Sequence, residues 1–334
     1  MDQDKVKKMI EAAKMYYFKD YSQQDIADKL GVSRPTVSRF LQQAKEDGFV
    51  QIRIMDPSED TENLAYRLKQ KYNLAKVIVV SVPHYEENLI REYLAEDTAL
   101  YLDEIIKDDD SLVLAWGQLM HQIAKKLHHK HVNHVSIVQM LGGFTHLEDN
   151  RYQSEILHLF AQALDSHPYF LPLPAIVDHV LVKQAMESDK YIRKILEMGK
   201  QANIALFTVD TSHSDSAFLQ SDYFSNEDRT EIKLKSAGYI GTRFYDKNGQ
   251  LCLSELSTRM IGLELEELKR KERSILVAGG AEKVEAIYGA LNGRFANVLI
   301  TDQLTAKSLL EKDQELNSRI DPSNAFPLSG IPLY

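Results

Sequence analysis

The segment that most constrains the fold runs from residue 22 to residue 43 and reads SQQDIADKLGVSRPTVSRFLQQ. Its pattern predicts two short helices joined by a tight turn. Ser22 suits the N-cap of the first helix, and Asp25, three residues later, can complete a capping box. Ala27 is small enough to let the two helices cross closely. Gly31 supplies the left-handed conformation at the turn that a Cβ would penalise.

The second helix of this pair is expected to have two different faces. Ser33 can cap it, and Pro35 lies in its first turn, where a missing N–H costs nothing. Three apolar residues should point to the core, namely Val37, Phe40 and Leu41. The other side chains are polar and partly cationic, which is typical of a helix that contacts bases and phosphates in the major groove. The residues expected to contact double-stranded DNA are Ser33, Arg34, Pro35, Thr36, Ser38, Arg39 and Gln42.

The alternative for this segment is an amphipathic pair of helices with a solvated outer face. A glycine turn or a capping serine occurs in many proteins, so neither feature decides between the two interpretations. The whole 22-residue pattern is much rarer, and it favours a helix-turn-helix that binds DNA.

The charge is distributed unevenly along the 334 residues, whose net charge is −9. Residues 1–55 carry 10 Lys and Arg against 8 Asp and Glu, whereas residues 56–334 carry 30 against 41. An acidic remainder discourages nonspecific adhesion to DNA and leaves binding to the small module. Because one such module binds weakly, we expect two modules of a homodimer or homotetramer to share a palindromic operator.

The composition also predicts the compartment. No apolar run approaches the length that spans a bilayer, and the N-terminus lacks a signal-peptide core and cleavage site. Cys252 is the single cysteine, so the chain forms no internal disulfide. We therefore expect a cytoplasmic protein with no membrane partner.

The sequence divides into parts with different patterns. A helix is predicted over residues 4–18, and FVQIRI at 49–54 alternates as a strand does, which suggests a small wing. The polar, Pro-containing stretch at 56–60 predicts a domain boundary. The predicted parts are a helix-turn-helix domain (1–55), a linker (56–60), an effector-binding and oligomerisation domain (61–312) and a C-terminal tail (313–334).

Beyond residue 60 the pattern predicts an α/β fold with a largely parallel sheet covered on both faces, because short apolar runs alternate with helical stretches. A hairpin is expected near 243–252, where Asn248 and Gly249 form a strong turn pair. The predicted strands are 77–82, 112–116, 135–141, 204–209, 274–278 and 296–301. The predicted helices include 88–106, 151–164, 191–200, 282–291 and 304–312.

A family resemblance rests on the segment already quoted and on LVLAWG, VQMLGG, EMGKQANIALFTV, GTRFYDKNG and SILVAGGAEKVEAIYGALNGRFANVLITDQLTA. Together they resemble the SorC-type bacterial transcriptional regulators, in particular the deoxyribonucleoside-regulator (DeoR) subgroup. The resemblance implies a winged-helix-like module and a Rossmann-like effector domain related to sugar-phosphate isomerases and deaminases. It also implies that a sugar phosphate or similar metabolite controls DNA binding, as in a repressor of a carbohydrate or nucleoside catabolism operon.

The expected effector site lies beyond the carboxyl ends of the parallel strands, where glycines follow three of them. Such glycines are equally common in tight turns that bind nothing. Arg243 is expected to have an anionic partner, either a carboxylate or an effector phosphate. Lys283 follows Gly280 in the first turn of a helix, where a cation suggests a bound anion. The predicted effector-binding residues are Gly117, Gln118, Gly142, Gly143, Thr145, His146, Asp210, Arg243, Arg259, Gly280 and Lys283.

Several positions depart from the pattern of that family. Relatives that sense deoxyribose phosphate have a lysine where this chain has Leu141, so no amine is available there to form an imine. Many members of that family have a hydroxyl-bearing residue two positions after a Trp-Gly pair. In this chain Gln118 and Leu119 follow Trp116 and Gly117, so that hydroxyl is missing. Asp210 would repel a phosphate but would bind sugar hydroxyls. The departures favour a reversibly bound sugar or nucleoside-derived metabolite, phosphorylated or not.

Two other functions are considered. A sugar-phosphate isomerase or deaminase fused to a helix-turn-helix needs a general base at the ligand, and only Asp210 and His146 suggest themselves, without a paired constellation. An architectural DNA-binding protein would need no effector. No cofactor is expected, and no metal site, because the histidines at 128, 129, 131 and 134 match no standard zinc spacing.

Overall fold

The computed structural model consists of two compact units, Met1–Asp56 and Pro57–Tyr334, and each is described by itself. Most of the predicted wing strand and of the linker lies outside the described residues. Among the described helices, none is both long enough and apolar enough to cross a membrane. The residues that the structure describes are 3–46, 49–50, 60–144, 151–213 and 217–320.

The first unit contains the predicted helix-turn-helix, α2 (Gln23–Leu30) and α3 (Arg34–Glu46), together with α1 (Gln3–Lys19). The predicted capping box is present, because the Asp25 N–H donates to Ser22 Oγ at 3.2 Å and the Ser22 N–H donates to Asp25 Oδ2 at 3.3 Å. Gly31 closes α2 in the left-handed conformation, with φ 62°. The three helices bury a common core of Met9, Ala12, Ala13, Ile26, Ala27, Val37, Phe40, Leu41 and Ala44.

The second unit is built on a seven-stranded sheet whose neighbouring strands are all parallel, in the order β1-β9-β8-β5-β2-β3-β4. The predicted α/β class is therefore confirmed. Six strands fall on predicted ones, and β4 was missed because it is three residues long and contains Pro168, a residue confined to edges such as this one. The strands are β1 (Lys76–Val80), β2 (Ser111–Leu114), β3 (Ser136–Gln139), β4 (His167–Tyr169), β5 (Ile204–Phe207), β8 (Arg273–Val277) and β9 (Val298–Asp302).

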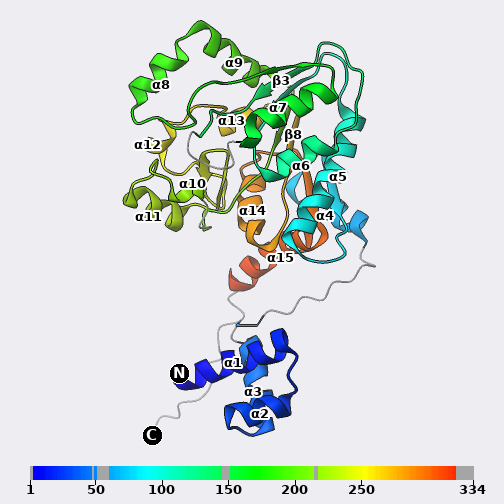
Figure 1. Ribbon diagram of the computed structural model, residues 1–334, viewed down its shortest axis with the longest axis vertical. Coiled ribbons are helices and arrows are strands. Elements are labelled where there is room, and N and C mark those ends of the chain that lie inside the picture. The colour runs from blue at the N-terminus through cyan, green and yellow to red at the C-terminus, as the bar shows by residue number, and fades with distance from the viewer. Residues whose placement is uncertain (1–2, 47–48, 51–59, 145–150, 214–216, 321–334) are drawn as a thin grey trace, which may run out of the picture. The chain divides into compact units, whose positions relative to one another are not determined.

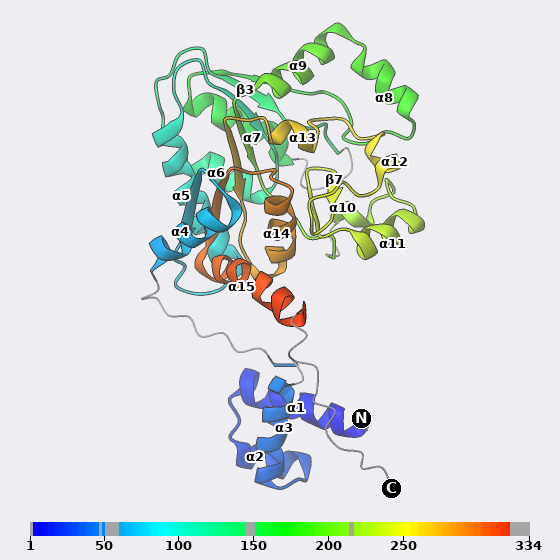
Figure 2. The ribbon, with the colours of Figure 1, turned by 180° about the vertical axis from the view of Figure 1, so that it is seen from behind.

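Helices cover both faces of this sheet (Figure 1; seen from behind in Figure 2). The alternation of side chains along each strand divides the core in two, with Val113 and Ala205 on one side and Leu112 and Ile204 on the other. One face is covered by α4 (Thr61–Tyr72), α9 (Lys190–Gln201), α14 (Val284–Asn292) and α15 (Gln303–Ile320). The other is covered by α5 (Glu87–Ile105), α6 (Gln118–Lys126) and α7 (Arg151–Ala163).

A smaller lobe of the second unit surrounds the antiparallel pair of β6 (Gly238–Ile240) and β7 (Arg243–Tyr245). The predicted reversal is present, since Gly249 has φ 75° and Tyr245 pairs antiparallel with Leu251. Phe144, Phe218, Phe224, Tyr239 and Phe244 form an aromatic core there. The helical elements of this part of the chain are α8 (Val180–Glu187), α10 (Ala217–Gln220), α11 (Asn226–Lys235), α12 (Ser254–Ser257) and α13 (Leu265–Leu268).

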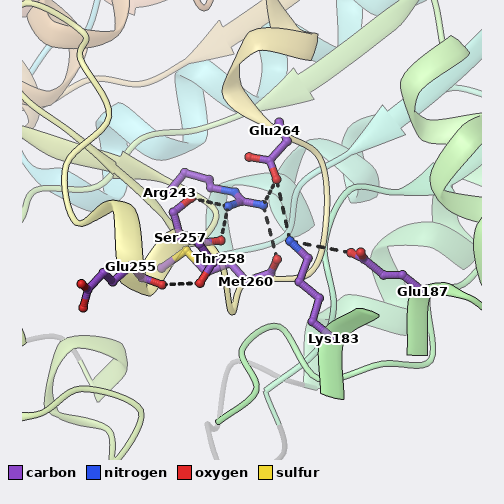
Figure 3. A network of polar contacts seen from close by, with 8 residues as sticks. All are labelled: Lys183, Glu187, Arg243, Glu255, Ser257, Thr258, Met260 and Glu264. Carbon is purple, nitrogen blue, oxygen red and sulfur yellow. Dashed lines mark hydrogen bonds and ion pairs between the residues drawn. The ribbon is translucent and has the colours of Figure 1, made fainter. Parts of the chain in front are cut away.

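Arg243 is buried in this lobe, with 3% of its surface exposed, and it joins β7 to the segment 257–264 (Figure 3). Its guanidinium donates to the Ser257 carbonyl at 2.8 Å and to Ser257 Oγ at 2.6 Å. It forms an ion pair of 2.6 Å with Glu264, whose carboxylate lies 4.0 Å from Lys183. Burial lowers the pKa of Arg243, and Glu264 opposes that shift. Of the two alternatives predicted for Arg243, the structure contains the ion pair with a carboxylate.

We expect Arg243→Ala to lower the free energy of unfolding by about 2–4 kcal/mol, because the Ser257 and Met260 carbonyls and Glu264 lose a charged donor. Denaturant unfolding of the full chain measures this loss. Arg259→Ala is the matched control, since the half-buried Arg259 side chain donates to the Val177 carbonyl at 3.3 Å and is not part of the ion pair. Equal stability of the two variants would show that the ion pair contributes little.

Candidate functional site

The helix α3 presents the face predicted to contact DNA. Its N-terminus is fixed by Ser33, whose Oγ accepts from the Thr36 N–H at 3.3 Å and lies 2.8 Å from Thr36 Oγ1. The apolar residues of the helix are buried, as predicted. Of the residues predicted to contact DNA, Ser33, Arg34, Pro35, Ser38, Arg39 and Gln42 are exposed, and Thr36 is partly exposed.

The second unit has a cleft of about 290 Å³ at the topological switch point of its sheet. From β2 the chain continues to β3 and β4 on one side, whereas from β5 it continues to β8 and β9 on the other. The connections that leave these two neighbouring strands therefore diverge and leave a crevice at their carboxyl ends, which is where ligands bind in open α/β sheets. The cleft lies between Ala115–Leu119, after β2, and Thr208–Thr211, after β5.

The two cations that line the cleft, Lys283 and Arg91, are each paired with a carboxylate. Lys283, in the short 3-10 helix η2 (Ala281–Lys283), lies 2.7 Å from Asp210. Arg91, in the first turns of α5, pairs with Glu87 and donates to Gln118 Oε1 at 3.0 Å. The cleft thus offers carboxylates and an amide for hydroxyl groups, and two cations for an anionic group.

Aromatic side chains form another part of the lining. Trp116 comes from the end of β2, whereas Phe218 and Tyr239 come from the smaller lobe. The rings of Phe218 and Tyr239 lie 5.2 Å apart between centroids. The Asp210 backbone pairs with that of Tyr239, with N–H to carbonyl distances of 3.2 and 3.0 Å. The cleft therefore combines an apolar surface for a ring with polar groups that could orient it.

Four of the predicted effector-binding residues lie together in this cleft: Gly117, Gln118, Asp210 and Lys283. These residues are far apart in the sequence, and the sheet brings them together. Gly117 and Gln118 follow β2, Asp210 follows β5 and Lys283 follows β8, and these three strands are neighbours. Leu141 also lines the cleft, and its side chain carries no amine that could form an imine with a ligand.

The predicted glycine pair Gly142–Gly143 does not line the cleft, because it packs against another segment of the chain. A Cβ on Gly142 would lie 2.5 Å from the Pro174 carbonyl oxygen. The N–H of Gly142 donates to Ile261 at 3.1 Å, and that of Gly143 to Leu173 at 2.8 Å. These N–H groups bond to carbonyls of distant segments, so they are not available to a ligand in the cleft, and the glycines do not form the tight strand-to-helix turn of the alternative.

Three further predicted residues, Arg243, Arg259 and Gly280, do not line the cleft. Arg243 has the carboxylate partner described above, and Arg259 donates to the Val177 carbonyl. The Gly280 N–H donates to Asp302 Oδ2 at 3.0 Å and to Thr305 Oγ1 at 2.9 Å. Thr145 and His146 lie outside the described residues.

Several lining residues were not predicted. Those after the strands, Trp116, Thr208 and Thr211, adjoin predicted positions, and a search for hydroxyl and aromatic residues at strand ends could have found them. No local pattern marks the others, because they reach the cleft from α5, η2 and the smaller lobe. They are Glu87, Arg91, Phe218, Tyr239, Gly241 and Glu282.

Both units of the chain match families of known proteins. A family model of a sugar-binding domain matches residues 56–311, and one of a Crp-like helix-turn-helix domain matches residues 13–59. The deoxyribonucleoside regulator of Bacillus subtilis is 47% identical over 310 residues, which are 93% of this chain and 99% of that regulator. The sorbitol operon regulator of Klebsiella pneumoniae is 28% identical over 311 residues, 92% of this chain and 99% of that one.

Solved structures show the same arrangement. The crystal structure of the full-length sorbitol operon regulator SorC from Klebsiella pneumoniae matches with a TM-score of 0.70 at 29% identity, over 92% of this chain and 100% of that one. A DeoR family transcriptional regulator from Listeria monocytogenes matches with a TM-score of 0.68 at 27% identity, over 75% and 99%. The exposed face of α3, the cleft at the switch point and these matches show that the chain belongs to the SorC-type family of sugar-binding transcriptional regulators, among the relatives of the deoxyribonucleoside regulators.

Proposed function

We propose that this regulator is a repressor whose operator binding is controlled by a sugar, sugar phosphate or nucleoside-derived metabolite bound in the cleft. The observation that carries the proposal is the meeting of Gln118, Asp210 and Lys283 at the switch point between β2 and β5. The identity to a deoxyribonucleoside regulator supports a metabolite from carbohydrate or nucleoside catabolism. In this proposal residues 1–55 bind DNA and residues 61–312 bind the effector and form a homodimer or homotetramer.

The arrangement of the cleft suggests how a ligand could shift the equilibrium between DNA-competent and DNA-incompetent forms of the protein. Trp116 and Asp210 belong to ends of the main sheet, whereas Tyr239 and Gly241 belong to the smaller lobe. A ligand that contacts both sides holds them at a fixed separation. Such a ligand controls DNA binding only if it binds the DNA-competent and DNA-incompetent assemblies with different affinities. A palindromic operator follows if two α3 helices related by a dyad bind adjacent major grooves.

We propose binding without turnover in this cleft. Asp210, one of the two residues considered as a general base, is paired with Lys283 at 2.7 Å, so its carboxylate already has a partner. The relatives quoted above are named as regulators, which supports the same interpretation. Detectable conversion of a sugar phosphate by the purified chain would favour the isomerase or deaminase alternative.

We predict that Arg39→Ala weakens operator binding by roughly 10- to 100-fold, the cost of about 1–3 kcal/mol expected for one arginine–base contact. Arg39 is exposed, so the melting temperature and the effector response should stay as in the parent chain. Fluorescence anisotropy with a labelled operator at fixed salt measures the affinity. Lys14→Ala removes an exposed cation from α1 and serves as the control, with a much smaller loss. Unaltered affinity of Arg39→Ala would place the DNA-contacting face elsewhere.

We predict opposite effects of Asp210→Asn on two classes of effector. The variant frees the Lys283 ammonium, so a phosphorylated sugar should bind about tenfold more tightly, because hydrogen bonds to charged groups contribute roughly 1.5–3 kcal/mol. A neutral sugar or nucleoside, which needs the carboxylate for its hydroxyls, should bind about tenfold more weakly. Thermal-shift titration measures both effects, since a ligand of the folded state stabilises it.

The companion variant Lys283→Ala should reduce binding of a phosphorylated effector at least tenfold. Lys235→Ala removes the cation of an exposed pair outside the cleft, 2.8 Å from Glu231, and should leave the titration unchanged. If Asp210→Asn and Lys283→Ala both respond to every effector like the parent chain, the effector does not bind in this cleft.

A further inference from the structure

A group of metal-ligating side chains lies at the opposite edge of the sheet from the cleft. His129 and His131 belong to the connection between α6 and β3, and Asp165 lies between α7 and β4. These connections end at the amino-terminal ends of β3 and β4, whereas the cleft lies at the carboxyl ends of β2 and β5. Whatever this group binds is therefore separate from the effector.

The three side chains converge on one point. His129 Nε2 lies 3.0 Å from Asp165 Oδ1, and His131 Nδ1 lies 2.7 Å from Asp165 Oδ2. The two imidazole centroids are 4.6 Å apart, with the rings nearly perpendicular at 89°. One ligand atom from each residue lies within 4.8 Å of the others. Around a zinc-sized ion the ligand atoms are separated by about 3.3 Å, given metal–ligand distances near 2.0–2.1 Å. Small side-chain rotations would bring the three atoms to that spacing.

The backbone holds these residues in place. Lys130, between the two histidines, donates its N–H to the Ala163 carbonyl at the end of α7, at 2.7 Å. Its ammonium donates to the Asp103 and Ile106 carbonyls at the end of α5, away from the histidine pair. Asp165 has the left-handed φ of 47°, in a turn that the bond from the Ser166 N–H to the Ala161 carbonyl, 2.8 Å, fastens to α7. The convergence thus does not depend on side-chain contacts alone.

We propose that His129, His131 and Asp165 bind a divalent transition-metal cation such as Zn²⁺, with water in the open positions. Two imidazoles and one carboxylate are a ligand set that suits Zn²⁺, Co²⁺ or Ni²⁺ better than Mg²⁺ or Ca²⁺, which take oxygen ligands. All three side chains are exposed, so an ion reaches them from solvent and exchanges with it. The cation would bridge the α6–β3 connection to the end of α7. The prediction of no metal site considered only the spacing of the histidines and could not include Asp165.

The test is isothermal titration of the tag-free full chain with Zn²⁺, followed by Co²⁺ with its visible absorption spectrum as a second signal. We expect one equivalent to bind, the melting temperature to rise, and a Co²⁺ spectrum with nitrogen ligands. His131→Ala and Asp165→Asn should each weaken Zn²⁺ binding at least tenfold and remove that spectrum, because two ligands remain. Unchanged operator binding and effector response of Asp165→Asn would show that the variant is folded and that the site is independent of the cleft.

The matched control is His128→Ala. His128 is exposed and adjacent in sequence, but its Nδ1 contacts Asp103 at 2.7 Å, outside the proposed ligand set. Its loss should change Zn²⁺ affinity less than twofold. The proposal is overturned if the parent chain shows no saturable binding. It is equally overturned if His131→Ala and Asp165→Asn bind as the parent does, which would mean an adventitious ion only.

Discussion

The pairing of β2 with β5 is the constraint on which the organisation of the second unit depends. Leu112, Val113 and Leu114 align with Ile204, Ala205 and Leu206, and all six are fully buried. The pairing brings together parts of the chain about 90 residues apart. Because the connections from the two strands leave in opposite directions, this register fixes both the position of the cleft and the residues at its base. This apolar pairing therefore also brings together the polar groups that we propose to bind the effector.

The sequence predicted the parts of the structure whose signals are local. The helix-turn-helix follows from a capping serine, a left-handed glycine and an apolar stripe, all within 22 residues. The buried parallel strands are recognisable as apolar runs, whereas β4 is too short and too polar to be found in that way. The pairing order of the sheet and the aromatic core of the smaller lobe depend on contacts between distant segments, so no local pattern contains them.

The candidate site illustrates the same limit. A cation at the start of a helix needs an anion, which makes Lys283 a candidate from sequence, and the structure places Asp210 beside it. The same reasoning applies to Arg243, yet its carboxylate partner is Glu264, and neither residue lines the cleft. Sequence reasoning can thus identify a charge that requires a partner. It cannot choose between a protein carboxylate and a ligand, because that choice depends on which distant segment packs nearby.

The close packing of Gly142 restricts which positions can adapt to a new effector. Its missing side chain lets the backbone of residues 173 and 174 approach, so no larger residue fits there without moving that segment. Leu141, its immediate neighbour, lines the cleft but is also buried, and it lies close to Gly241 and Gly262. A residue of another size at position 141 would therefore reshape this side of the cleft only if its neighbours moved with it, whereas the backbone of the glycine pair is held in place by residues 173 and 174.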